Sequence, residues 1–240
     1  MGTKVVINDV SKSFGTKTVL RNISLQISQS EIFGLLGPSG AGKTTLVKCI
    51  AGIDEASTGS VTIFGGKMPS LAVMKEIGYM TQSDALYEEL TALENLNFFA
   101  AIYGLKGTKK KERITSVMRL VNLEKELKQK VGEYSGGMKR RLSLAISLLH
   151  EPKIIILDEP TVGIDPVLRQ SIWMELERLS KAGTTVIVTT HVMDEAEKCH
   201  RLGMIRDGDL IALGTPKELK KNIHAENIEE VFIHYGGVKK

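Results

Sequence analysis

The chain has 240 residues, of which 42% are apolar and 25% are charged, and its formal net charge at pH 7 is +4. This length fits one large domain, with or without an inserted subdomain, and the mild positive excess by itself identifies no partner. The longest apolar runs, near residues 98–105 and 154–157, fall far short of the roughly 20 residues that a membrane-spanning helix needs, so the chain is not expected to cross a membrane itself.

Patterns typical of strands and helices alternate along the chain, which predicts a mostly parallel sheet flanked by helices. Residues 4–9 and 19–27 contain alternating polar and apolar positions and predict antiparallel strands. Residues 32–36 are an apolar run that ends at a Gly-Pro pair, and a helix with one apolar face should follow it as far as Ala51. A further strand is expected around residues 61–63.

The middle of the chain, from about residue 85 to residue 149, is predicted to be helical and interrupts the strands. Thr91 and Glu94 have the spacing of a capping box, and the helix that they begin is expected to stop at Gly104. Apolar side chains at spacings of three and four from Ile114 predict a second helix, and the same pattern from Met138 predicts a third.

Strand patterns return after the helical block. Residues 153–157 and 184–189 are typical of buried strands, and an Asp-Pro pair at 165–166 begins a helix between them. An Asp-Gly pair at 207–208 predicts a hairpin, after which one more helix should start. The tail from Glu226 has no pattern from which an element can be assigned.

One segment fits the pattern G-x-x-x-x-G-K-[ST] at every fixed position, with a strand before it and a helix after it. In such a loop the glycines let backbone N–H groups approach phosphate, and the helix N-terminus adds a positive dipole end. Lys43 would place its charge on the β- and γ-phosphates, and Thr44 would offer its hydroxyl to Mg²⁺. A Gly-rich turn without a ligand is disfavoured because strand, helix and motif agree. The predicted nucleotide-binding residues are Gly37, Pro38, Ser39, Gly40, Ala41, Gly42, Lys43, Thr44 and Thr45.

Two carboxylates directly follow the four apolar residues at 154–157. A buried strand that ends in acids places them at the edge where open α/β sheets hold ligands. Asp158 would hold Mg²⁺, and Glu159 would activate the attacking water. By itself this pattern would favour an acidic surface turn, and the phosphate-binding motif upstream reverses that preference.

The segment from Tyr134 to Met138 resembles the signature loop of ABC ATPases, usually written L-S-G-G-Q, and lies between the two motifs above as that family requires. A serine and two glycines that open a helix form a second anion-binding helix N-terminus. In the family this loop caps the nucleotide of the other subunit in a head-to-tail dimer, which implies that role for Ser135, Gly136 and Gly137. Tyr134 and Met138 stand where the family usually has Leu and Gln. A bare helix N-cap is the structural alternative.

Four smaller motifs agree with the family in order and spacing. Gln82 resembles the Q-loop glutamine, which implies a Mg²⁺ ligand that links the site to the helical block. Asp165 ends a segment similar to the D-loop, which crosses the dimer. His191 is similar to the switch histidine at the γ-phosphate, and Phe14 to the aromatic residue that stacks on adenine. Taken singly, such a histidine is usually a helix cap and such a phenylalanine is usually part of a core.

The resemblance covers almost the whole chain and implies one ABC ATPase domain of the α/β class over residues 1–240. Residues 1–84 and 150–220 would form a P-loop NTPase core of the RecA-like type together with a small antiparallel β subdomain. Residues 85–149 would form an inserted α-helical subdomain that carries the signature loop, and residues 221–240 a short C-terminal tail.

The implied reaction is the hydrolysis of ATP to ADP and phosphate with Mg²⁺. Catalysis of this kind depends on positioning and charge stabilisation. The residues expected to carry it are Lys43, Gln82, Glu159 and His191, with Thr44, Gln82 and Asp158 as metal ligands. An inactive regulatory cassette is a rival interpretation, but Glu159 and His191 argue against it.

A transporter motor is the function that the resemblance implies. The chain would pair with an ATPase subunit in a homo- or heterodimer and with a transmembrane permease on another polypeptide, peripherally at the cytoplasmic face of the cell membrane. Residues 86–105 and 227–232 resemble the drug- and polysaccharide-exporter branch, which favours export, and aromatic residues between 87 and 103 would dock the permease. The alternative is a soluble ABC ATPase acting on nucleic acid or ribosomes. The chain has no long coiled-coil insertion, tandem cassette or basic aromatic stripe, so no nucleic-acid partner is expected.

Overall fold

The structure, a computed structural model, describes residues 3–83 and 85–237, so the predicted boundary at residue 84 and the last three residues of the tail lie outside the described part. The strands are β1 Thr3–Phe14, β2 Lys17–Ser28, β3 Ile32–Leu36, β4 Thr58–Ile63, β5 Gly66–Lys67, β6 Ile77–Met80, β7 Ile154–Asp158, β8 Thr185–Thr190, β9 Arg201–Arg206 and β10 Asp209–Gly214. The helices are α1 Lys43–Ala51, α2 Leu71–Met74, α3 Ala92–Ile102, α4 Gly107–Leu120, α5 Gly136–Leu148, α6 Pro166–Lys181, α7 Met193–Ala196, α8 Pro216–Asn222 and α9 Ile228–Tyr235, and a short 3₁₀ helix covers Val131–Glu133.

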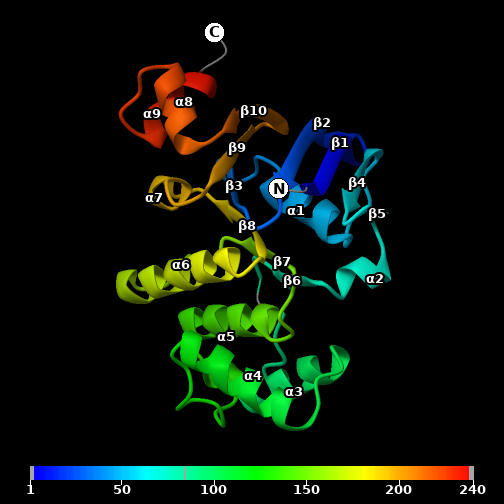
Figure 1. Cartoon of the computed structure of the whole chain (residues 1–240), viewed down its shortest axis with the longest axis vertical. Coiled ribbons are helices and arrows are strands. Elements are labelled where there is room, and N and C mark those ends of the chain that lie inside the picture. Colours follow the sequence, from blue (N-terminus) through cyan, green and yellow to red (C-terminus); the bar gives the residue numbers. More distant parts are fainter. Residues whose placement is uncertain (1–2, 84, 238–240) are drawn as a thin grey trace.

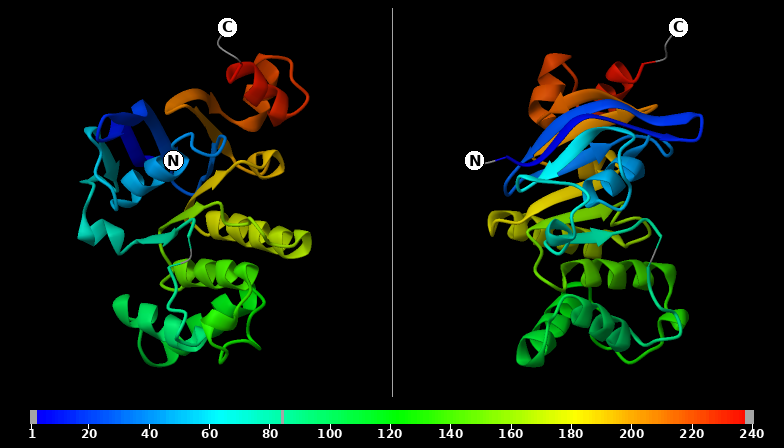
Figure 2. Two further views of the ribbon diagram at one scale, coloured as in Figure 1. Left: turned by 180° about the vertical axis from the view of Figure 1, so that it is seen from behind. Right: turned by 90° about the vertical axis from the view of Figure 1, so that its right-hand side faces the viewer.

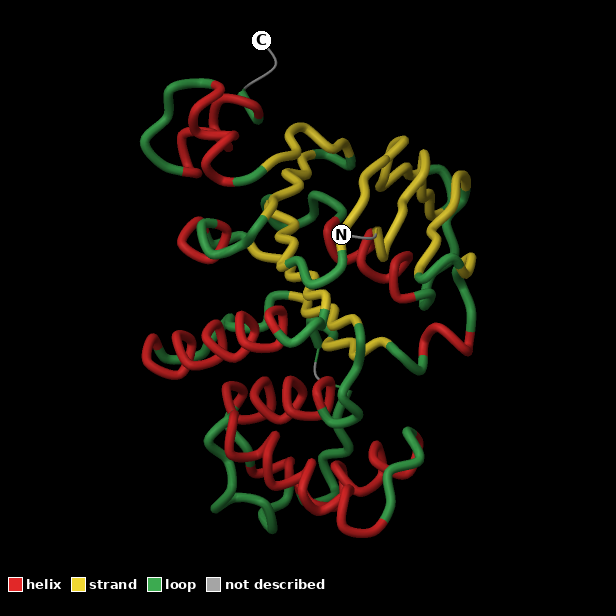
Figure 3. The backbone as a smooth tube through the Cα atoms, in the orientation of Figure 1, coloured by secondary structure: helices red, strands yellow, loops and turns green. Residues whose placement is uncertain are grey.

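These strands form two sheets, whose arrangement is visible in Figures 1 and 3. The smaller sheet is antiparallel with the order β2-β1-β4-β5, and the larger one has the order β10-β9-β3-β8-β7-β6. In the larger sheet all neighbouring strands are parallel except β9 and β10, which form the predicted hairpin. This architecture confirms the predicted α/β class with a small antiparallel part.

Two hydrophobic cores lie on opposite faces of the large sheet. Every residue of β3, β7 and β8 is buried, as expected for parallel strands that are covered on both faces. Successive side chains of a strand point to opposite faces. Accordingly, Ile154 and Ile156 belong to the core shared with α1 and the small sheet, whereas Ile155 and Leu157 belong to the core shared with α5 and α6.

The helices α3, α4 and α5 gather at the end of the molecule away from the small sheet (Figure 2). The capping box at the start of α3 is confirmed, because the Thr91 side chain accepts from the Glu94 N–H and the Glu94 side chain accepts from the Thr91 N–H. The helix α5 packs against α4 on one side and against β6 and β7 on the other. It therefore joins the helical end to the edge of the large sheet.

Several short elements were not predicted from the sequence, among them β6, α2, α7 and α9. In β6, Gly78 weakens the strand pattern, but a Cβ at this position would lie 2.1 Å from the Ser147 carbonyl oxygen, so the close approach of α5 requires glycine. The tail contains α9, which is capped by Asn227 and buries Ile228 and Val231. Eight residues are too few to display a helical period, which is why this helix escaped prediction.

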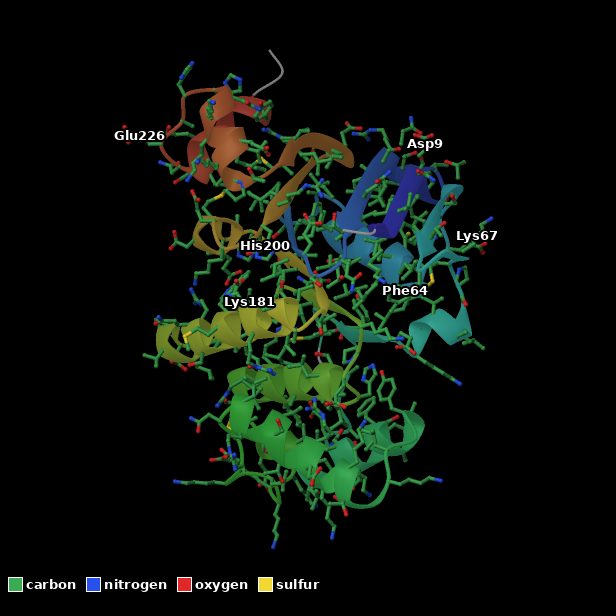
Figure 4. The ribbon with its side chains drawn as sticks, in the orientation of Figure 1. Asp9, Phe64, Lys67, Lys181, His200 and Glu226 are labelled. Atoms are coloured by element: carbon green, nitrogen blue, oxygen red, sulfur yellow. The ribbon has the colours of Figure 1, made fainter. Side chains whose placement is uncertain are left out.

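Lys181, the last residue of α6, and His200 are labelled in Figure 4. The carboxylate of Glu177 lies 3.2 Å from Lys181 Nζ and 3.4 Å from His200 Nε2, but such exposed pairs contribute little to stability.

Within residues 3–83 and 85–237, no helix combines the length and the apolar character needed to cross a bilayer.

Candidate nucleotide-binding site

The loop between β3 and α1 folds around the amino group of Lys43. Lys43 Nζ donates to the carbonyl oxygens of Gly37 at 2.7 Å and Pro38 at 3.0 Å. Gly42 caps α1 with φ 106, a left-handed conformation that favours glycine. The first N–H groups of α1 have no carbonyl partner inside the helix, so this loop has the donors that an anion requires.

A cavity of about 300 Å³ lies beside this loop. Eight of its ten lining residues belong to the loop segment 39–45 or to the small sheet, and the other two reach it from distant motifs. The lining residues are Val19, Ser39, Gly40, Ala41, Gly42, Lys43, Thr44, Thr45, Gln82 and Glu159. All of them except Val19 were predicted site residues, and Val19 was missed because a valine in a strand carries no functional signal.

Lys43 is a buried cation, with 5% of its side chain exposed. Burial lowers its pKa, and the neighbouring carboxylates of Glu159 and Asp158 act in the opposite direction. The distance from Lys43 Nζ to Glu159 Oε1 is 3.9 Å. The positive charge at the end of the cavity is thus held by carboxylates of the same chain.

The predicted catalytic side chains meet at Glu159. Its Oε1 lies 3.1 Å from His191 Nδ1, and its Oε2 accepts from Gln82 Nε2 at 3.5 Å. Because a carboxylate only accepts, Nδ1 of His191 carries the proton in this contact. Glu159 has φ 52, a conformation uncommon for a residue other than glycine, and its N–H donates to Thr189 Oγ1 at 3.0 Å.

Asp158 lies at the end of β7 and is completely buried. Its Oδ1 accepts from the Thr189 hydroxyl, whereas its Oδ2 has no hydrogen-bond partner among the described residues. A buried carboxylate oxygen without a partner is costly unless a ligand or ion satisfies it. Together with the cavity-lining Thr44 and Gln82, this oxygen provides the hard ligands that Mg²⁺ prefers.

Around the site lie two buried charged residues that were not predicted from the sequence. Arg140 on α5 donates to the backbone carbonyls of Gln82 and Glu159. Glu195 on α7 accepts from the hydroxyls of Thr161 and Thr190, the second at 2.7 Å, and so braces the segments that lead to the D-loop and to His191. No sequence signal marks either residue, because each one has at least one partner that is distant along the chain.

The predicted signature and D-loop residues lie outside the cavity. Ser135 caps α5 and Asp165 caps α6, each accepting from a backbone N–H of the first turn of its helix. The two loops are adjacent, since a Cβ at Gly137 would lie 3.1 Å from the Gly163 carbonyl oxygen. Ser135 and Gly136 are exposed at this surface. The chain by itself therefore separates these motifs from the phosphate-binding loop.

Tyr134 explains one departure from the usual signature pattern. Its ring is buried, its hydroxyl donates to the Glu126 carbonyl oxygen at 2.8 Å, and burial raises its pKa to about 12. Tyr134 thus fills a core position, and Met138 also packs against that core. Phe14 is half exposed under the amino group of Lys12 and does not line the cavity, so its stacking on adenine stays a prediction.

Comparisons with known proteins identify the family and agree with the fold. The ABC transporter family model matches residues 20–162. The chain is 41% identical over 229 residues to the linearmycin resistance ATP-binding protein LnrL of Bacillus subtilis (strain 168), covering 94% of this chain and 73% of that protein. It is 40% identical over 238 residues to the Nod factor export ATP-binding protein I of Rhizobium etli, covering 98% of this chain and 74% of that protein. The dimeric post-hydrolysis structure of the ATP-binding cassette MJ0796, bound to ADP and Pi, has a TM-score of 0.82 at 28% identity over 88% of this chain and 98% of that one.

The fold and the site define a P-loop ATPase. The chain belongs to the ABC transporter family. It is an ATP-binding and ATP-hydrolysing subunit of that family. The comparisons favour this transport ATPase over the alternative of a soluble ABC ATPase that acts on nucleic acid or ribosomes.

Proposed function

We propose that the chain holds the phosphates of ATP in the cavity beside Lys43 and that Glu159 activates the water that attacks the γ-phosphate. The convergence of Lys43, Gln82 and His191 on the Glu159 carboxylate supports this assignment. On ATP binding, Lys43 would exchange its carboxylate neighbour for phosphate oxygens, which leaves Glu159 free to accept a proton from water. His191 and Gln82 hold the two carboxylate oxygens and fix their direction.

Mg²⁺ fits this site because Thr44 and Gln82 line the cavity. In addition, Asp158, the neighbouring residue of the cavity-lining Glu159, has a buried Oδ2 without a partner among the described residues. We assign Thr44, Gln82 and Asp158 to the ion, with Asp158 acting through water. When bound, the ion neutralises charge on the phosphate oxygens. Thr189 keeps Asp158 oriented by donating to its other oxygen.

We also propose that two chains bind head to tail, so that Ser135, Gly136, Gly137 and Asp165 contact the nucleotide of the partner. The exposure of the α5 N-terminus and its proximity to Gly163 support this arrangement. Both half-sites are present in one chain, so a homodimer suffices. A heterodimer with another ATPase subunit is the other form to test during purification.

The proposed biological role is export driven by a transmembrane permease on another polypeptide, with this chain peripheral at the cytoplasmic face of the membrane. The names of the two curated relatives, which refer to linearmycin resistance and Nod factor export, support export. Residues 85–149 would act as the inserted helical subdomain on a core formed by residues 1–84 and 150–220, with residues 221–240 as a tail.

Aromatic residues on α3 and before it would dock the permease. Tyr87 and Phe98 are 45% and 41% exposed, and their ring centroids lie 4.9 Å apart. Phe99 instead packs against the core, and Tyr103 stacks on His150 with centroids 3.6 Å apart. We therefore limit the proposed docking surface to Tyr87, Phe98 and the exposed Ile102.

Cysteine crosslinking to a co-expressed permease tests this surface. Both native cysteines are free and buried, so Phe98→Cys and Ile102→Cys introduce the reactive thiols. Ile233→Cys on α9 is the matched control because Ile233 is at least as exposed as Ile102 and Phe98, and α9 lies at the other end of the molecule (Figure 1). We expect crosslinks from Phe98 and Ile102 only. Efficient transport without any crosslink from these two positions would place the docking surface elsewhere.

Light scattering tests the ATPase and dimer assignments together. The Glu159→Gln chain should bind Mg-ATP, hydrolyse it slowly and double its mass, whereas the wild-type chain should return to monomer as ATP is consumed. Glu151→Gln is a matched control, since Glu151 also has a positive φ of 56 but lies on the surface near Lys109. Wild-type hydrolysis by Glu159→Gln would refute the role of Glu159 whatever the mass.

A further inference from the structure

The hydrogen-bond ladder between β6 and β7 ends just before the predicted catalytic residues. Its last pair is Met80 with Leu157. The next two residues on each segment are Thr81 and Gln82 on one side and Asp158 and Glu159 on the other. Beyond the ladder, the backbone carbonyls of these residues can no longer bond across the β6–β7 pair, yet buried carbonyls require donors.

The guanidinium of Arg140 supplies these donors. Its Nη1 donates to the carbonyl oxygens of Thr81 at 2.6 Å and Gln82 at 2.8 Å. Its Nη2 donates to the carbonyl oxygen of Glu159 at 2.7 Å and to that of Asp158. A single side chain thus bridges the two segments where the sheet stops, and only 6% of Arg140 is exposed.

The chemistry of arginine suits this position. The guanidinium is planar, permanently charged and carries its terminal N–H groups in a fixed fork, so it can bond two pairs of carbonyls in one plane. A lysine ammonium is a point charge with rotatable donors and cannot reproduce that fork. The carbonyl oxygens that accept these hydrogen bonds also offset part of the cost of burying the charge.

Arg140 connects these carbonyls to α5, the helix that opens with the signature loop. The six residues from Ser135 to Arg140 span less than two turns, so a displacement of the helix N-terminus moves the guanidinium with it. Arg140 is the described residue through which α5 bonds both the Gln82 and the Glu159 backbone at once. Movement of the signature loop therefore reaches the two side chains that face the cavity.

We infer that Arg140 is a positioning residue: it holds the backbones of Gln82 and Glu159 at the cavity and makes their placement depend on the position of the signature helix. This inference rests on the proposed roles of Glu159 and Gln82 in hydrolysis. Arg140 itself does not line the cavity, and its hydrogen bonds to these carbonyls connect it to the two residues that do.

Arg141 offers a matched control on the same helix. It donates to the backbone carbonyls of Val121 at 3.0 Å and Asn122 at 3.1 Å, and these bonds stay within the helical block. Arg140→Lys and Arg141→Lys therefore both keep the charge and lose a fork to backbone carbonyls. The two variants differ in whether the lost bonds reach the catalytic segments.

Steady-state ATPase assays, nucleotide titration and thermal unfolding of the full chain separate the two roles. We expect Arg140→Lys to lower kcat by about tenfold to a hundredfold, the cost of small misplacements of catalytic groups, while the Kd for ATP stays within about threefold. Both variants should lower Tm by similar amounts. Arg141→Lys, unlike Arg140→Lys, should keep kcat within about twofold of the wild-type value. An unchanged kcat for Arg140→Lys, or equal losses of kcat in both variants, would overturn the inference. If Arg140→Lys does not fold, Arg140→Gln, which keeps one amide donor group, replaces it under the same criteria.

A double-mutant cycle with Glu159→Gln shows whether Arg140 acts through Glu159. In the Glu159→Gln background, adding Arg140→Lys should change the residual rate by less than about twofold, because the positioned base is already absent. Losses that multiply would assign Arg140 a purely structural role. If Glu159→Gln alone keeps the wild-type rate, the proposed role of Glu159 fails instead, and that result is read from the single variant.

Discussion

The chain contains two helix N-termini with the composition of anion sites, and their surroundings differ. At α1, the glycine-rich loop faces a cavity closed by Gln82 and Glu159 of the same chain. At α5, Ser135 and Gly136 are exposed, and a Cβ added at Gly136 would meet no atom within 4 Å. A Cβ added at Gly42, by contrast, would lie 2.8 Å from Leu20.

The contrast shows that the same local feature, a glycine-rich helix N-terminus, can have two different surroundings and two different proposed roles. Both helices offer unpaired first-turn N–H groups and a positive dipole end. At α1 the chain adds a buried lysine, a carboxylate and a histidine, which are the groups that the proposed chemistry needs. At α5 it adds only an N-cap serine and an open surface, which fits a role completed by a second molecule.

Of the variants that compare the two regions, Glu159→Gln beside α1 should have the largest effect on turnover. Loss of the base is expected to lower turnover by about a hundredfold to ten-thousandfold, because a general base contributes that much, while ATP binding is retained. Phosphate release under saturating ATP measures the rate, and Glu151→Gln should behave as wild type. A turnover rate within an order of magnitude of the wild-type rate would mean that Glu159 is not the base and that the cavity at α1 is not the place of hydrolysis.

Lys43→Ala should mainly weaken ATP binding. A charge-assisted contact is worth about 1.5–3 kcal/mol, which corresponds to roughly a tenfold to hundredfold increase in Kd. Lys48→Ala on the same helix is the control, since Lys48 is not among the residues that line the cavity. Isothermal titration with nucleotide gives both affinities, and an equal Kd for wild type and Lys43→Ala would contradict the phosphate-binding assignment.

His191→Ala should lower kcat by about tenfold, the equivalent of one hydrogen bond to a charged group, with little change in the Kd for ATP. The histidine bonds Glu159 rather than the loop that binds phosphate, so the loss should fall on turnover. His200→Ala, which removes an exposed histidine paired with Glu177, serves as the control. Parallel losses in kcat and affinity would indicate that His191 supports the fold of the site.

Ser135→Ala should have the smallest effect and the one most dependent on the partner chain. Removing an N-cap costs about 1 kcal/mol of stability, and Asn227→Ala removes the equivalent cap from α9 as a control. Only Ser135→Ala should reduce the rise of specific activity with protein concentration, since its hydroxyl would contact the nucleotide of the other chain. If specific activity rises with protein concentration equally in both variants, Ser135 does not take part in the function of the dimer.

Elements with local signals were predictable, and elements without them were not. The capping box at Thr91 and the Asp-Gly turn at 207–208 are set by residues no more than three positions apart, so the sequence displays them directly. The strand β6 is short and contains Gly78, and its strand state depends on pairing with β7. The helix α9 likewise depends on burial of Ile228 and Val231 against the rest of the chain.

The sequence by itself determined the phosphate-binding loop, the acids at the end of β7 and the family, because in these motifs backbone geometry and chemistry are encoded by neighbouring residues. Only the tertiary structure decided that the side chains of Lys43, Gln82 and His191 lie next to the Glu159 carboxylate. It also decided that Arg140 and Glu195 bond the segments around Glu159. The partners of these two residues are backbone carbonyls and common hydroxyls on other elements. Any residue has such a carbonyl, so the sequence does not mark which one an arginine will bind until the sheet edge brings them together.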